Sequence, residues 1–279
     1  MVDELIFKHG EIPREKLKKP GEFIANHSTV LLYKNRPFAS GTFVKCGSRF
    51  GILTAYHAIE SFNFTPNSTD QLGIATAEYP HALLIEMQYL NPHYIEFRSP
   101  DKYGGPDMVF LEILDQSKLF WIKENKSFWD IPSEHGVSTI KECYSNSDSL
   151  WAIAGLPQSA KQEEQPEGGF DCVIGLPVQV YFSGIEGGFE AGGFDYIELK
   201  ANYESKDPMA DSFVGVSGGG LWRTPMSIDR KDLKALKFGE PVLSGLQFLQ
   251  TPLEGNSRRL RCHGYKSVNL LFTTVLKNG

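Results

Sequence analysis

Three side chains in this sequence could together perform nucleophilic acyl transfer: Ser217, His57 and Asp107. Ser217 lies in the glycine-rich run GVSGGG (residues 215–220), and glycines allow the backbone to turn sharply and bring its N–H groups close to a substrate. A serine hydroxyl is a weak nucleophile at neutral pH, so it needs a nearby base, a group that orients the base, and hydrogen-bond donors for the oxyanion. A histidine and an aspartate are suited to the first two roles.

The elements expected to position these residues are short strands. His57 follows the apolar stretch GILTAY (residues 51–56), and Asp107 follows a turn at Pro106 and precedes the apolar stretch MVFLEI (residues 108–113). Taken singly, each residue has an ordinary structural alternative: a buried histidine, a turn-forming aspartate, a serine in a glycine-rich loop. The chain order His, Asp, Ser, with each residue in a strand or turn context, favours the catalytic interpretation.

The three motifs, LTA-x-H, D-x-V-x-L-x-I and G-x-S-G-G, resemble those of the trypsin-like serine peptidases with the chymotrypsin fold. The three motifs match the family specifically, whereas the segments between them resemble it only weakly. It implies an all-β fold of two six-stranded antiparallel β-barrels, with the active site in the cleft between them and a C-terminal helix. It also implies that His57 acts as base, that Asp107 orients it, and that the backbone N–H groups of Gly215 and Ser217 form the oxyanion hole.

The same resemblance suggests where a substrate would bind. Asp211 falls where trypsin itself carries the aspartate at the base of its P1 pocket, which implies a preference for Arg or Lys; the alternative is a solvated loop residue. Phe248, Leu249 and Gln250 belong to a segment expected to pair with the substrate backbone. Gln250 stands where many relatives have a glycine, which would narrow the pocket entrance, and Gly264 is expected in the far wall.

Three positions depart from the pattern of the secreted members. Ala58 and Phe213 stand where those enzymes have cysteines, so the disulfides that brace them cannot form, and this agrees with a reducing compartment. Val216 stands where they have an aspartate that pairs with the new N-terminus after zymogen cleavage. We therefore expect activity that is either constitutive or controlled by an activating partner or ligand.

Composition limits the other function classes. The chain has 279 residues and 41% hydrophobic residues, enough for a large all-β fold, and its net charge of −6 argues against a nucleic-acid-binding surface. No window approaches the roughly 20 apolar residues of a membrane span, and no signal peptide is visible, so we expect a soluble, cytoplasmic protein. No cofactor is expected, and no metal, because His263 has no second ligand at a suitable spacing.

The chain divides into an N-terminal arm (residues 1–25, with a short helix near 14–19), a first barrel (26–125) and a second barrel (126–279). His57 and Asp107 fall in the first barrel and Ser217 in the second. A C-terminal amphipathic helix is predicted over residues 267–277, with apolar residues at i, i+3, i+4 and i+7 from Val268 and with Ser267 as N-cap. The charged insertion 227–237 is predicted to be a solvated helix or loop.

The sequence therefore predicts a serine endopeptidase that cleaves a protein substrate through an acyl-enzyme. By resemblance we expect a bacterial cytoplasmic protease in a regulated pathway, such as stress response or defence against phage. One alternative is a catalytically silent, protease-like binding module. Another is an esterase, because G-x-S-x-G also matches the nucleophile elbow of α/β-hydrolases; that fold needs a helix after the serine and a late histidine, for which His263 is available.

Overall fold

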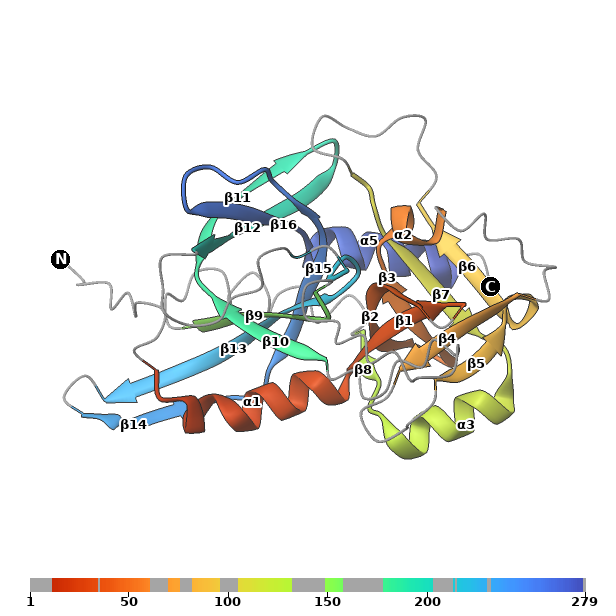
Figure 1. Ribbon diagram of the computed structural model, residues 1–279, viewed down its shortest axis with the longest axis horizontal. Coiled ribbons are helices and arrows are strands. Elements are labelled where there is room, and N and C mark those ends of the chain that lie inside the picture. The colour runs from red at the N-terminus through yellow and green to blue at the C-terminus, as the bar shows by residue number, and fades with distance from the viewer. Residues whose placement is uncertain are drawn as a thin grey trace, which may run out of the picture.

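Short apolar runs separated by glycine, proline and asparagine form the strands of two sheets in the computed structural model (Figure 1). The structure describes residues 12–34, 36–60, 70–75, 82–95, 105–131, 149–157, 178–202, 213, 215–229 and 232–277. Nearly all of the strand pairs are antiparallel. The predicted antiparallel all-β class with a C-terminal helix is therefore confirmed at this level.

The first sheet contains the strands of the first half of the chain, in the order β5-β4-β1-β2-β3-β7-β6, with the short β8 added to β2. Their bounds are β1 (Ser28–Tyr33), β2 (Arg36–Cys46), β3 (Arg49–Thr54), β4 (Gln71–Ala75), β5 (Leu83–Glu86), β6 (Leu90–Tyr94), β7 (Val109–Ile113) and β8 (Trp129–Asp130). The β2–β8 pair is parallel.

The second sheet has the order β10-β9-β13-β15-β16-β12-β11, with β14 paired to β13. Its strands are β9 (Ser149–Gly155), β10 (Gln179–Ser183), β11 (Ile185–Ala191), β12 (Phe194–Asn202), β13 (Gly220–Asp229), β14 (Asp232–Phe238), β15 (Val242–Gln250) and β16 (Ser257–Gly264).

The two edges of each sheet are joined by one bent segment of chain. In the first sheet the outermost strands β5 and β6 are separated only by the 3-10 turn η1 (Met87–Tyr89). In the second sheet the outermost strands β10 and β11 are separated only by Gly184. Each sheet must therefore curl, because its first and last strands lie next to each other in the sequence.

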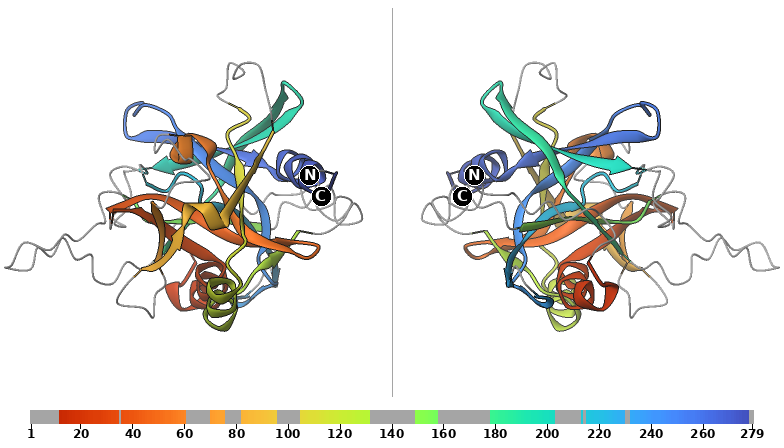
Figure 2. Two further views of the ribbon diagram at one scale, coloured as in Figure 1. Left: turned by 90° about the vertical axis from the view of Figure 1, so that its right-hand side faces the viewer. Right: turned by 90° about the vertical axis from the view of Figure 1, so that its left-hand side faces the viewer.

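The terminal helices connect the sheets crosswise. The helix before the first sheet, α1 (Arg14–Asn26), packs on the second, where its Gly21 faces Phe182 of β10. The helix after the second sheet, α5 (Tyr265–Lys277), packs Phe272 on Phe110 of the first, with ring centroids 5.1 Å apart. The described residues also form the short helices α2 (Tyr56–Glu60) and α3 (Gln116–Asn125). Helices α1 and α3 lie at one end of the molecule and α2 toward the other (Figures 1 and 2).

The amphipathic C-terminal helix is confirmed, since Val268, Leu271, Phe272 and Val275 are all buried. The assignment of Ser267 as its N-cap is wrong, because α5 already begins at Tyr265. The helix N-terminus is instead capped from β12: the carboxylate of Asp195 accepts hydrogen bonds from the backbone N–H of Lys266 and of Ser267.

Two other local predictions are corrected. The described residues of the segment predicted as a solvated helix or loop, 227–229 and 232–237, belong to the paired strands β13 and β14, and Leu236 is buried. At the N-terminus, the short helix predicted near residues 14–19 extends to Asn26. No helix in the described part of the chain is long and apolar enough to cross a membrane.

Candidate active site

His57 and Asp107 are brought together by the pairing of β3 with β7. Strand β3 ends at Thr54, which pairs with Val109 of β7, so the residues just after β3 face the residues just before β7. Here the carboxylate of Asp107 accepts two hydrogen bonds from His57: Oδ2 lies 2.5 Å from Nδ1, and Oδ1 lies 2.8 Å from the backbone nitrogen. The two bonds fix both the ring tautomer and the position of the main chain, leaving Nε2 to act as a base.

The surroundings of His57 in the folded protein raise its pKa, so the ring is protonated more readily than a histidine in water. The side chain of Asp107 is only 13% exposed, whereas that of His57 is 49% exposed. Burial lowers the pKa of His57, but the hydrogen bond and the charge of Asp107, with a smaller contribution from Glu60, outweigh it, so the pKa is raised above its usual value. Asp107 therefore stabilises the imidazolium that would form when His57 takes a proton.

Ser217 lies in a tight turn between the second sheet's β12 and β13. Gly215 and Gly218 on either side have φ angles of 94° and 90°, in the left-handed region that favours glycine. The turn is closed by hydrogen bonds from the N–H of Val216 to the carbonyl of Phe213 and from the N–H of Gly219 to that of Val216. The glycines of the motif thus supply backbone conformation, and the half-buried serine is presented on a fixed turn.

The turn is docked on the first sheet beside His57. The N–H of Ser40 in β2 donates to the carbonyl of Ser217 (2.9 Å), and its hydroxyl donates to the carbonyl of Gly215 (2.8 Å). A Cβ on Gly218 would lie 2.9 Å from the nitrogen of Ala55, two residues before His57. In the described part of the chain the Ser217 hydroxyl and the His57 ring make no hydrogen bond with each other, as is common in enzymes without substrate.

The two N–H groups predicted to form the oxyanion hole lie on this same turn. Within the described segments, no acceptor is found for the backbone N–H of Gly215 or of Ser217. An oxyanion hole needs donors that are not already hydrogen-bonded within the protein. The carbonyl of Gly215 is held by Ser40, so the orientation of the peptide plane that follows it is fixed from the other sheet.

The predicted substrate-binding residues fall in two places. Leu249 and Gln250 form the end of β15, paired with Arg261 and Leu260 of β16, and the side-chain oxygen of Gln250 accepts hydrogen bonds from the N–H of Phe213 and from Arg258. Phe248 precedes them, buried against β16. Gly264 lies apart, because it pairs with Gly245 at the other end of the same ladder and packs against Asp195. Asp211 lies outside the described residues.

Two residues that the sequence did not identify as part of the site contact it. Ser40 lies in an ordinary strand sequence, and nothing in that sequence marks it as the residue that holds the serine turn. His263, predicted only as the late histidine of the esterase alternative, is fully buried and accepts a hydrogen bond at Nε2 from the backbone N–H of Asp107, at 3.0 Å. Both contacts join one sheet to the other.

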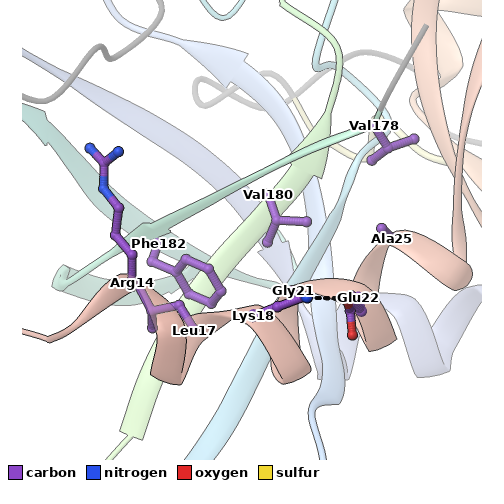
Figure 3. A pocket seen from close by; sticks show the side chains of 9 residues that line it. All are labelled: Arg14, Leu17, Lys18, Gly21, Glu22, Ala25, Val178, Val180 and Phe182. Atoms are coloured by element: carbon purple, nitrogen blue, oxygen red, sulfur yellow. Dashed lines mark ion pairs between the residues drawn. The ribbon is translucent and has the colours of Figure 1, made fainter. Parts of the chain in front are cut away.

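Other features of the described residues do not compete with this site. A groove of about 430 Å³ lies between α1 and β10, lined by Leu17, Val180 and Phe182 and flanked by the Lys18–Glu22 ion pair (Figure 3); it contains no residue of the site. Among the described residues no three His, Cys, Asp or Glu side chains are grouped to hold a metal ion. Ser217 is followed by strand β13, not by a helix.

Compared with protein-family models and with curated proteins, the sequence matches none. The functional assignment therefore depends on the geometry of the site itself.

Proposed function

We propose that the protein is a serine endopeptidase that uses Ser217 as nucleophile, His57 as general base and acid, and Asp107 as the residue that orients His57. Ser217 Oγ would attack the carbonyl carbon of a peptide while His57 Nε2 takes its proton. The tetrahedral oxyanion would be bound by the N–H groups of Gly215 and Ser217. His57 would then protonate the leaving amine, and water would hydrolyse the acyl-enzyme.

The observation that carries this proposal is the position of the serine turn. The turn leaves two N–H groups without an acceptor among the described residues and packs against Ala55, while Asp107 binds His57 through two hydrogen bonds. On this proposal the nucleophile, the base and the oxyanion donors come from segments that adjoin strands of two different sheets. A histidine or an aspartate with only a structural role would not require this combination.

The strand order supports the finer expectation of two six-stranded barrels. If β5 and β6 are counted as one bent strand, the main path of the first sheet has six strands, the number expected for such a barrel. The second sheet behaves in the same way when β10 and β11 are counted as one. On this proposal the site lies where the barrels meet, as in the trypsin-like peptidases.

We propose that a peptide substrate adds a strand beside residues 248–250. One edge of this segment is paired with β16, whereas β13 pairs with β15 only as far as Leu246. An extended peptide running beside this segment would form main-chain hydrogen bonds with it, as in strand addition. A preference for Arg or Lys, from Asp211, remains part of the proposal.

We also propose that the enzyme works inside the cell in regulated proteolysis and has no zymogen switch based on residue 216. Val216 is fully buried in an apolar cluster with Phe213 and Leu221, so this position has no carboxylate with which a new N-terminus could pair. Cys46 and Cys262 are buried, free thiols. Control would then come from a substrate or partner protein.

Reaction with a fluorophosphonate probe tests the proposal. We expect the folded protein to be labelled on Ser217, and Ser217→Ala to abolish labelling because the reacting oxygen is removed. Ser183→Ala is the matched control, since Ser183 is a serine on β10 outside the site and should not affect the reaction. Tandem mass spectrometry would identify the labelled residue.

A folded protein that does not react, with or without candidate partners, would contradict the proposal and favour a silent binding module. Labelling that persists in Ser217→Ala would equally contradict it. Proteomic comparison of wild type and Ser217→Ala in the native host would separate a peptidase from an esterase, because only a peptidase produces new protein N-termini.

A further inference from the structure

His263 lies in the second sheet, yet it binds the backbone of Asp107 in the first. It belongs to β16 and is separated from Asp107 by 156 residues. The N–H of Asp107 donates to His263 Nε2 at 3.0 Å, and the carboxylate of the same residue accepts both hydrogen bonds from His57. A continuous series of hydrogen bonds therefore runs from His263 through Asp107 to His57.

The hydrogen bond from the N–H of Asp107 defines the protonation state of His263. A backbone N–H can only donate to a ring nitrogen that carries no proton, so Nε2 is unprotonated and the neutral ring carries its proton on Nδ1. The ring is fully buried and stacks on Phe248, with centroids 4.3 Å apart and planes inclined by 19°. Tyr196 packs against it at 5.2 Å. The acceptor is thus held rigidly.

The chain that leads into Asp107 is shaped to fit this ring. A Cβ on Gly105 would lie 2.8 Å from Cε1 of His263 and would also meet the hydroxyl of Tyr196. Only a residue without a side chain lets the backbone pass so close to the ring. Residues 105–107 are therefore positioned by the second sheet as well as by β7, which follows them in the first.

We propose that His263 is a positioning residue: it fixes the main chain of Asp107 so that the carboxylate meets His57, and it thereby makes the catalytic pair dependent on correct docking of the two sheets. This inference rests on the proposed function. A displacement of a catalytic group by about 1 Å can reduce a rate about 100-fold, so a single buried hydrogen bond at this point is sufficient to matter.

The test compares two substitutions of His263, one that keeps a hydrogen-bond acceptor for the N–H of Asp107 and one that removes it. In His263→Gln the side-chain oxygen can occupy the place of Nε2, whereas His263→Leu fills similar space without an acceptor. Leu260→Ala is the control for destabilisation, since Leu260 is a buried residue of the same strand and is paired with Leu199 of β12. The readouts are the downfield proton resonance of the His57 Nδ1–H···Asp107 hydrogen bond and the rate of fluorophosphonate labelling, both compared at equal folded fraction.

We expect His263→Leu to lower the labelling rate at least about tenfold and to remove or broaden the His57 resonance, and His263→Gln to restore both. Leu260→Ala should lower stability without either effect. If His263→Leu does not fold, His263→Asn replaces it, because its shorter side chain cannot reach the N–H of Asp107.

An unchanged His57 resonance in a folded variant without the acceptor would overturn the proposal. The His57 proton resonance also distinguishes a failure of the positioning proposal from a failure of the proposed catalytic function. If wild type does not react with the probe but His263→Leu still abolishes the resonance, the catalytic proposal fails and positioning by His263 stands. If wild type and His263→Leu react equally, the positioning role fails and the catalytic proposal stands.

Discussion

At the scale of single residues, the chemistry of the site depends on the protonation of His57. The bonded carboxylate of Asp107 has two effects that oppose each other at neutral pH. It strengthens the base in the reaction, because it stabilises the imidazolium, and it also keeps more of the resting histidine protonated, because it raises the pKa. Only the neutral form can take the proton of Ser217.

The raised pKa predicts the acid limb of the pH profile. We expect the rate of fluorophosphonate labelling to fall as the pH drops through a pKa above about 6.5, the ordinary value for histidine. Asp107→Asn removes the charge, so its acid limb should move to lower pH, while its maximal rate falls because the amide no longer holds the correct tautomer. Rates measured between pH 5 and pH 9 check both; identical acid limbs in the two proteins would contradict the assignment.

The same shift affects stability in a defined direction. The folded pKa of His57 is raised above the unfolded value, so below about pH 6.5 the bonded imidazolium contributes its full stabilisation. That contribution is lost as the pH rises through the folded pKa. Because the ring is half-exposed, the effect is small, and it is best detected as a difference between wild type and Asp107→Asn.

At the scale of elements, the serine turn depends on glycines for two separate reasons. Gly218 has a φ angle of 90°, and a side chain there would meet Thr54, the carbonyl of Ser40 and the nitrogen of Ala55. Gly215 has a similar φ angle, and its carbonyl is bound by Ser40. The turn is therefore specified both by its own backbone conformation and by its contact with β3.

Gly218→Ala should accordingly damage both stability and reactivity. The unfavourable φ angle alone costs about 1–3 kcal/mol, and the new methyl group must displace the turn from β3. We expect a lower free energy of unfolding in urea and a labelling rate reduced at least about tenfold at equal folded fraction. Gly187→Ala is the control: no atom lies within 4 Å of its Cβ position, so both quantities should stay near wild type. A fully reactive Gly218→Ala would show that the turn need not be fixed.

Elements with a local signal were predictable from the sequence. The strand before His57 and the spacing of Val268, Leu271 and Phe272 in α5 are encoded in neighbouring residues. The β13–β14 hairpin was misread because its many charged residues suggested a solvated helix or loop, although Leu236 is buried. In a strand with one buried face, apolar and polar residues alternate, so a strand can contain many charged residues on its solvent-exposed face.

Contacts between distant residues could not be predicted from local patterns. The cap of α5 comes from Asp195, 72 residues before Ser267, and the bond from Ser40 to Gly215 spans 175 residues. The bond from Asp107 to His263 spans 156 residues. A serine in a strand or a histidine in an apolar segment has the same local appearance whether or not it binds a distant loop. The motifs therefore predict the proposed catalytic residues but not the residues that support them.

At the scale of the whole molecule, the site exists only where the two sheets meet. The terminal helices link the two sheets (Figure 1): α1 contacts β10 of the second sheet and β1 of the first, and α5 contacts β12 and β15 of the second sheet and Phe110 of the first. Polar contacts hold them together at the site, through His263 on one side and Ser40 on the other. Any change that loosens the docking should therefore affect reactivity before it unfolds either sheet.

Ser40 offers the most direct test of this dependence. Its buried hydroxyl donates to the carbonyl of Gly215 and accepts from the N–H of Leu156, so it links β2 to two segments of the second half of the chain. Ser40→Ala would leave both groups buried without this partner, at a cost of about 1–3 kcal/mol. We expect a lower urea midpoint and, at equal folded fraction, a slower reaction of Ser217, because the peptide that carries the oxyanion donors loses its support.

Ser28→Ala is the matched control for Ser40→Ala. Ser28 is equally buried, but its hydroxyl donates to the carbonyl of Ile24, which also accepts from the N–H of His27. Ser28→Ala should lower the free energy of unfolding less than Ser40→Ala does. It should leave the labelling rate unchanged, because the Ser28 hydroxyl is bonded to Ile24 and not to the serine turn. If the two variants lose reactivity equally at equal folded fraction, docking by Ser40 does not control the site; if only Ser40→Ala does, the chemistry of Ser217 depends on a hydrogen bond supplied by the opposite sheet.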